Sequence, residues 1–268
     1  MKTRWTPILI VSLFNVSFAQ AETTQPDPSD LTQVNSFVFG TVDNQGMLKG
    51  MVGLAGQYSE DNTFMGLVEH NLATKTNSTG SKDNNTRLRY FQVLDVDSAA
   101  IKQAGFSVDY IRGWENTNGI GSDLVAIGTI AKVATPWEAL SIYPNVAYVM
   151  GTARQDGSMD ASLSGYQLNL FGSLSIGNWG QYAVFQPQYM HVSGDVDSDK
   201  NSGNLRVFGD VLQVKTGYGQ PISKDGLWWV EASHTYTKSE LEAKSNSGGI
   251  ALPTDNDHKF EVGVAYYF

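Results

Sequence analysis

The C-terminal segment Glu261-Val262-Gly263-Val264-Ala265-Tyr266-Tyr267-Phe268 is the most informative stretch of this chain. Large apolar residues alternate with small or polar ones, and the last residue before the carboxylate is aromatic. Because successive side chains of an extended strand point to opposite faces, Val262, Val264 and Phe268 fall on one face and Glu261 on the other. The segment therefore predicts a strand with one apolar and one polar face at the very end of the chain.

Segments with the same alternation fill the rest of the chain, and each is about ten residues long, the length of a membrane-spanning β-strand. Turn residues separate them, and the connections alternate between short and long, as in membrane barrels. Twelve segments have this pattern: 35–42, 47–58, 63–74, 86–97, 104–115, 123–134, 140–153, 161–174, 180–193, 203–218, 227–239 and 258–268. They predict an all-β fold, a transmembrane antiparallel up-and-down β-barrel of 12 strands.

The surroundings of a membrane barrel determine which face of each predicted strand points outward and which points inward. Hydrocarbon offers no partner to a charge or an amide, so the apolar face must meet lipid and the polar face must line the interior. Aromatic residues are expected near both strand ends, where amphipathic rings sit at the headgroups. Those expected at the outer ends are Tyr90, Trp114, Tyr148, Tyr166, Tyr189, Phe208 and Tyr236. Those expected at the periplasmic ends are Tyr58, Phe64, Phe106, Trp179, Tyr218, Trp228 and Phe268.

The N-terminus has the three parts of a secretory signal peptide. Lys2 and Arg4 form a basic region, residues 8–18 are mostly apolar, and Ala19-Gln20-Ala21 is a small-x-small cleavage site. The apolar part is shorter than the about 20 residues that a transmembrane helix needs. We therefore predict a signal peptide at 1–21, a short periplasmic leader at 22–34 and a single barrel domain at 35–268.

Composition excludes several classes of function. The chain has no cysteine and a formal net charge of −9, so it has neither thiolate chemistry nor a basic nucleic-acid footprint. No nucleotide-binding loop or zinc motif occurs, and the histidines have no carboxylate at ligand-like spacing. We predict no metal site, no cofactor and no nucleic-acid partner.

The C-terminal segment resembles the β-signal of bacterial outer-membrane β-barrel proteins, with Glu261, Gly263, Tyr266 and Phe268 at its pattern positions. That resemblance implies recognition by the barrel assembly machinery of a Gram-negative bacterium. It also implies an outer-membrane location with both termini in the periplasm, and contact with outer-membrane lipids and lipopolysaccharide.

The predicted interior is polar and mixed in sign. A polar interior either lines a water channel or forms a plug of hydrogen-bonded side chains, and twelve strands enclose more space than side chains of eight strands fill. We therefore predict a porin-like passive channel for small hydrophilic solutes. The expected pore-lining residues are Lys49, Glu69, Arg87, Arg89, Asp95, Asp109, Lys132, Lys215, Glu231 and Glu261.

Two alternative functions stay open. His191-Val192-Ser193 and Asn204 resemble the catalytic residues of outer-membrane phospholipase A, which implies Ser193 as nucleophile, His191 as base and Asn204 as the residue that orients the imidazole. Gly194 departs from that family's pattern after the serine. The other alternative is a structural or receptor barrel without an open pore, similar to a solitary autotransporter-type barrel. The expectation is that the protein is not an enzyme.

Overall fold

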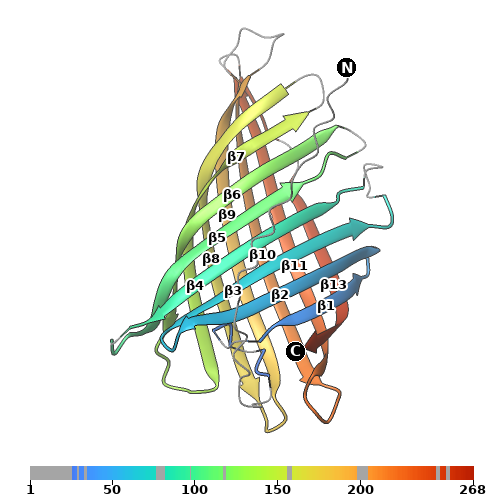
Figure 1. Ribbon diagram of the computed structural model, residues 1–268. Helices are drawn as coiled ribbons and strands as arrows, with labels where there is room; N and C mark the ends of the chain where they lie inside the picture. The colour runs from blue at the N-terminus through green and yellow to red at the C-terminus, as the bar shows by residue number, and fades with distance from the viewer. Residues whose placement is uncertain are drawn as a thin grey trace, which may run out of the picture.

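The alternating segments form the wall of one closed β-barrel in the computed structural model (Figure 1). The structure describes residues 26–28, 30–32, 35–76, 82–96, 98–116, 119–155, 159–197, 205–245, 248–251 and 254–268. Its strands are β1 (Phe37–Asp43), β2 (Met47–Ser59), β3 (Asn62–Ala73), β4 (Asn85–Asp95), β5 (Ile101–Gly113), β6 (Ile120–Val133), β7 (Leu140–Gln155), β8 (Met159–Ile176), β9 (Gln181–Asp197), β10 (Leu205–Pro221), β11 (Trp228–Ser245), β12 (Gly248–Ala251) and β13 (Asp255–Tyr267). Within the described ranges, no helix is long and apolar enough to cross a membrane.

Each strand pairs antiparallel with its neighbour in sequence, and β1 pairs with β13 to close the barrel. The short β12 pairs with the end of β11, directly beyond the part of β11 that pairs with β13. It therefore extends the position of β13 and adds no separate strand to the circle, so β1–β11 and β13 make 12 wall strands. The predicted fold class and strand number are confirmed. β11 continues to Ser245, beyond the predicted end at residue 239, because its upper part pairs with both β10 and β12.

The barrel has two different rims. Phe37 pairs with Tyr267, so the start of β1 and the end of β13 share one rim, here called the terminal rim, at the bottom of Figure 1. The opposite rim, here called the loop rim, contains the β1–β2 turn at residues 44–46. β7 to β11 are 16 to 18 residues long and β1 only 7, so the wall is taller on one side.

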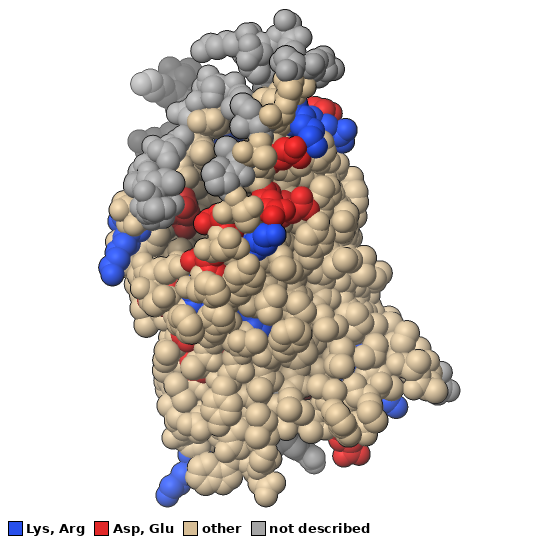
Figure 2. Space-filling view, turned by 180° about the vertical axis from the view of Figure 1, so that it is seen from behind, with Lys and Arg blue, Asp and Glu red and all other residues tan. Residues whose placement is uncertain are grey.

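The outward face carries an apolar belt. Side chains such as Val52, Leu168 and Val264 are more than two-fifths exposed, although they are in the middle of strands. Charged side chains visible in Figure 2 gather toward the loop rim and leave most of the wall below it free of charge. A surface of this kind is stable against hydrocarbon, because the strands of the closed wall pair their backbone polar groups with one another.

One predicted ring position is wrong. Tyr90 was expected at the outer end of its strand, but its ring packs between those of Phe64 and Phe106 at 6.2 and 5.7 Å. The Tyr90 hydroxyl also lies 3.3 Å from the Tyr58 hydroxyl. This places Tyr90 in the aromatic row nearer the terminal rim, because the slant of the strands carries the middle of β4 alongside the start of β3.

Candidate functional site in the barrel lumen

The lumen is filled by aromatic side chains near the terminal rim. Trp229 is fully buried there with Phe39, Tyr182 and Tyr267, which come from four different strands. The Trp229 indole N–H donates to the Gly226 carbonyl oxygen at 2.6 Å, so its one polar atom is satisfied. The Trp228–Trp229 pair explains this plug, because adjacent residues of a strand face opposite sides and one ring must point inward.

A second group of side chains closes the neighbouring part of the lumen. Tyr143 is almost fully buried with Val93 and Ile130. Phe91 on β4 meets Phe171 on β8 edge to face, with ring centroids 6.0 Å apart. Because β4 and β8 are not neighbours in the wall, this contact crosses the interior of the barrel.

Residues of the predicted leader lie inside the barrel. Leu31 packs against the Tyr143 cluster, and Asp27 and Pro28 line the central cavity. The Asp30 carboxylate accepts a hydrogen bond from the Lys132 ammonium at 2.6 Å and a second from the Tyr143 hydroxyl. Residues 1–25, and with them the predicted signal peptide, lie outside the described residues.

The contacts of Asp30 also determine its protonation. Burial alone would raise the pKa of its carboxyl, but hydrogen bonds from Lys132, Thr32 and Tyr143 outweigh burial and lower the pKa below its ordinary value of 3.8. Asp30 is therefore ionised at neutral pH. It holds the leader to β6 and β7 through a charge-assisted hydrogen bond, a stronger type than one between neutral groups.

A cavity of about 490 Å³ lies within the barrel. Ion pairs join side chains of neighbouring strands along its lining. Arg87 donates through Nε to both oxygens of Asp109 at 2.9 and 3.1 Å, and Arg89 Nη2 lies 3.1 Å from Glu69 Oε2. Arg87 Nη2 also donates a hydrogen bond to Gln188 Oε1 on β9 at 3.4 Å. Because β4 and β9 are on opposite sides of the barrel, this contact spans the lumen and narrows it.

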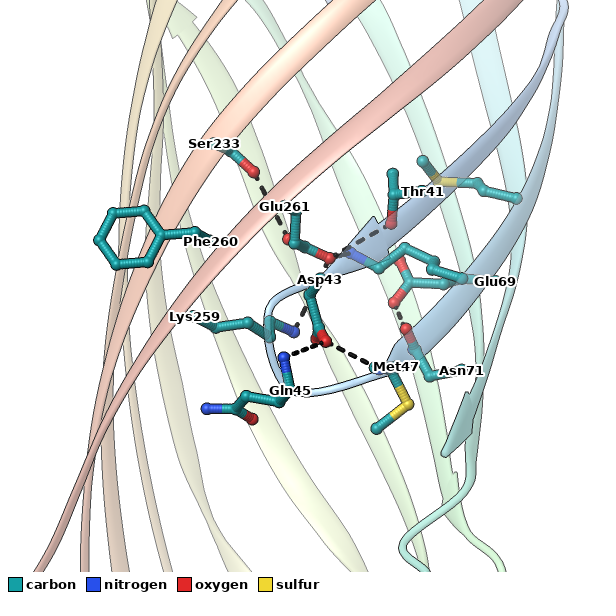
Figure 3. A network of polar contacts seen from close by, with 12 residues as sticks. Thr41, Asp43, Gln45, Met47, Glu69, Asn71, Ser233, Lys259, Phe260 and Glu261 are labelled. Carbon is teal, nitrogen blue, oxygen red and sulfur yellow. Dashed lines mark hydrogen bonds and ion pairs between the residues drawn. The ribbon is translucent and has the colours of Figure 1, made fainter. Parts of the chain in front are cut away.

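The closing seam adds a second ionic group (Figure 3). Glu261 on β13 lies 2.7 Å from Lys49 Nζ and 3.8 Å from Lys259 Nζ, and its side chain is only 4% exposed. Beside it, the Asp43 carboxylate accepts backbone N–H groups of Gln45 and Met47 at 2.9 and 2.7 Å, which shapes the β1–β2 turn. The residues that follow β1 are thereby held next to β13.

Most of the predicted pore-lining residues border the cavity. They are Lys49, Glu69, Arg87, Arg89, Lys215, Glu231 and Glu261. Asp109 points inward and accepts hydrogen bonds from Arg87. Lys132 lies nearer the terminal rim and forms an ion pair with Asp30. Asp95 is at the end of β4, where it accepts a hydrogen bond from Gln103 at 2.7 Å, away from the cavity.

The remaining C-terminal positions divide between the faces. Tyr266 packs outward on Trp228, with ring centroids 4.9 Å apart, and Phe268 is 63% exposed at the terminal rim. Gly263 faces inward, and a Cβ there would stand 2.5 Å from Thr41 Cγ2. Glycine at this position allows β1 and β13 to approach closely at the seam.

The predicted catalytic residues lie on the outward face. His191 Nδ1 is 2.9 Å from Asp210 Oδ1 on β10, and the Tyr189 hydroxyl donates to the same carboxylate oxygen. Ser193 follows His191 on the same face of β9, and Asn204 lies outside the described residues. Asp210 was not predicted, although a carboxylate between Phe208 and Leu212 on the lipid-facing side of β10 was a signal. Its direct pairing with His191 depends on the register of β9 and β10.

Comparison with known proteins supports the fold. No protein family model matches the chain, and no curated protein matches it in sequence. Among solved structures, the COG4313 outer membrane channel from Pseudomonas putida F1 is similar at a TM-score of 0.52 and 7% identity, covering 91% of this chain and 100% of that one. The KdgM porin in complex with disordered oligogalacturonate has a TM-score of 0.43 at 10% identity, with 88% and 99% covered.

The alcaligin outer membrane receptor FauA from Bordetella pertussis is a longer protein. It is similar at a TM-score of 0.41 and 9% identity, and the match covers 88% of this chain but 41% of the receptor. The chain thus spans less than half the length of that receptor and all of the COG4313 channel. A closed antiparallel barrel with an apolar belt, a polar lumen and structural similarity to the COG4313 channel has the fold of the bacterial outer-membrane β-barrel proteins.

Proposed function

We propose that this protein is an outer-membrane channel through which small hydrophilic solutes pass passively. The observation that carries the proposal is the cavity of about 490 Å³ in a lumen bordered by Lys, Arg, Glu and Gln side chains. An interior that served only as a structural plug would bring its side chains together without leaving such a space. In this conformation the aromatic cluster and the leader residues Asp27, Pro28, Asp30 and Leu31 fill the terminal end, so passage requires their displacement.

Planar-bilayer recording on the refolded mature protein tests this function. We expect discrete conductance steps, and larger steps for a variant that lacks residues 22–34. Liposome swelling with sugars of increasing size would then give the upper size of the solute. Absence of conductance from both proteins, in any salt, would contradict a channel and leave a structural or receptor barrel.

The proposal includes an orientation, with the terminal rim in the periplasm and the loop rim outside. Because the chain has no cysteine, single cysteines report their own accessibility. On intact cells a membrane-impermeant maleimide should label Gln45→Cys in the β1–β2 turn but not Asp225→Cys in the β10–β11 turn. The opposite labelling would invert the orientation.

A second candidate function is ester hydrolysis of outer-leaflet lipids. It is favoured by the His191–Asp210 contact on the outward face, because ionisable residues exposed to lipid are costly and usually functional. Asp210 would orient the His191 imidazole, the role predicted above for Asn204, and Ser193 would supply the nucleophile. Nδ1 of His191 is held by Asp210, which leaves Nε2 to accept the serine proton.

Phospholipid hydrolysis in mixed micelles with calcium tests the second function. Wild type should release fatty acid, Ser193→Ala should release none, and Asp210→Asn should retain a small fraction of the rate. Ser164→Ala is the matched control, since Ser164 pairs with Ser193 from β8. Equal release by wild type and Ser193→Ala would exclude this site.

A further inference from the structure

Lys215 and Glu231 border the cavity and form no ion pair with any residue that the structure describes. Among the described residues, no carboxylate lies within ion-pair distance of Lys215, and no Lys or Arg lies within that distance of Glu231. The other cations that border the cavity are each matched to a carboxylate: Lys49 and Lys259 to Glu261, Arg87 to Asp109, and Arg89 to Glu69. Lys215 and Glu231 therefore differ in kind from the rest of the lining.

The two cross-strand neighbours of Lys215 are polar and carry no charge. Lys215 pairs across the sheet with Gln186 on β9 and with Thr235 on β11, and all three border the cavity. No hydrogen bond joins the Gln186 amide to another group in the described part of the chain. Gln188, one inward position further along β9, offers its amide N–H₂ group, because its oxygen already accepts from Arg87.

Glu231 has a different setting. Its Oε1 accepts a hydrogen bond from the Tyr182 hydroxyl at 2.5 Å, at the end of the cavity next to the aromatic plug. Along β11, Glu231 is four residues from Thr235, the partner of Lys215. At about 3.3 Å per residue, the backbone positions of Glu231 and Thr235 are roughly 13 Å apart. The directions of the Glu231 and Lys215 side chains then set the distance between the two charges.

We propose that the cavity binds a small zwitterion, such as a dipeptide, with its carboxylate at Lys215 and its ammonium at Glu231. An isolated buried charge is costly unless it is paired, and a ligand with one charge of each sign satisfies both residues at once. Gln186 and Gln188 add hydrogen bonds to the ligand carboxylate. A volume of about 490 Å³ is in the range of about 300–1,000 Å³ that small-molecule sites occupy.

This inference deepens the proposed channel function, because it names the solute class that the lumen recognises. Equilibrium dialysis of the refolded mature protein in detergent micelles tests it without requiring conductance. The probes are radiolabelled glycylglycine, its C-terminal amide and its N-acetyl derivative, at low salt. We expect wild type to bind glycylglycine at least about tenfold more tightly than either derivative, the effect of one lost charge-assisted contact.

The two contacts are separated by variants. Lys215→Gln should bind glycylglycine and its amide equally, yet still discriminate against the N-acetyl derivative. Glu231→Gln should bind glycylglycine and its N-acetyl derivative equally, yet still discriminate against the amide. Lys244→Gln is the control, because Lys244 is exposed at the loop rim and pairs with Glu242 at 2.8 Å.

Two outcomes would overturn the inference. They are equal affinity of wild type for all three probes and no binding of any probe. Binding without conductance would instead contradict the channel alone, and conductance without selective binding would contradict the inference alone.

Discussion

Different interactions hold the side chains together at two levels of the lumen, the terminal rim and the cavity. Near the terminal rim, buried rings such as Trp229 and Tyr143 pack together with Leu31 of the leader. At the level of the cavity, matched ion pairs such as Arg87–Asp109 hold side chains across the wall and leave space between them. Apolar packing gains free energy by excluding water, whereas ion pairs tolerate water beside them. The difference predicts that the stability of the barrel depends mainly on the aromatic level, and that the proposed permeability depends on the level of the cavity.

The largest effect is expected from Trp229→Ala. Removing this buried ring should lower the free energy of unfolding by about 4 kcal/mol, the usual cost of an aromatic-to-alanine change in a core. Trp228→Ala, which removes the adjacent outward ring, should cost about 1 kcal/mol. Urea titration of the refolded protein in lipid vesicles measures both. Equal losses would mean that the aromatic cluster contributes no more than the lipid-facing surface.

Arg87→Ala should have a somewhat smaller effect on stability and a larger effect on conductance. It leaves the inward Asp109 carboxylate without its cation, at a cost of about 3 kcal/mol, and removes the contact to Gln188 that narrows the lumen. The double variant Arg87→Ala/Asp109→Ala should recover part of the stability and keep the higher conductance. Unchanged single-channel conductance in both variants would show that Arg87 does not limit the passage.

Asp30→Asn connects the two levels through the leader. It removes the charge that holds Asp30 to Lys132, so we expect weakening of that contact by about 2 kcal/mol and more frequent channel opening at neutral pH. The wild type has a corresponding pH dependence. Since the pKa of Asp30 is lowered in the folded protein, the stabilisation is present above its ordinary value of 3.8 and is lost as pH falls through the lower folded value.

The same recordings between pH 7 and pH 3 check this sign. Wild-type opening should stay constant to about pH 4 and then rise toward the level of Asp30→Asn, which itself should not respond over that range. A response centred near neutral pH would assign the closure to another group. A leader that stays bound in Asp30→Asn would point to Leu31 as its main anchor.

The smallest effect is expected for Lys244→Gln at the loop rim. Lys244 and Glu242 are about half exposed and lie 2.8 Å apart, so their loss should change stability by no more than about 0.5 kcal/mol. The same urea titration measures it. A larger change would mean that the upper part of β11 supports the wall more than its exposure indicates.

The twelve wall strands were predictable because a period of two is a local property of each segment. The same period predicts which side chains face inward, such as Lys49 and Glu69. It does not predict which inward groups meet. The Asp30–Lys132 and Arg87–Gln188 contacts join positions about a hundred residues apart in the chain, and they depend on the tilt and register of several strands. Tyr90 was misplaced for the same reason, since strand slant is not visible in one segment.

Histidine is the side chain that most often ligates transition metals in proteins. All four histidines of this chain are on the outward face: His70 beside Thr86, His191 beside Asp210, and His234 against His258. The wall therefore keeps every imidazole away from the interior of the barrel. A transition-metal ion would meet this ligand on the outer surface and not among the side chains that border the cavity.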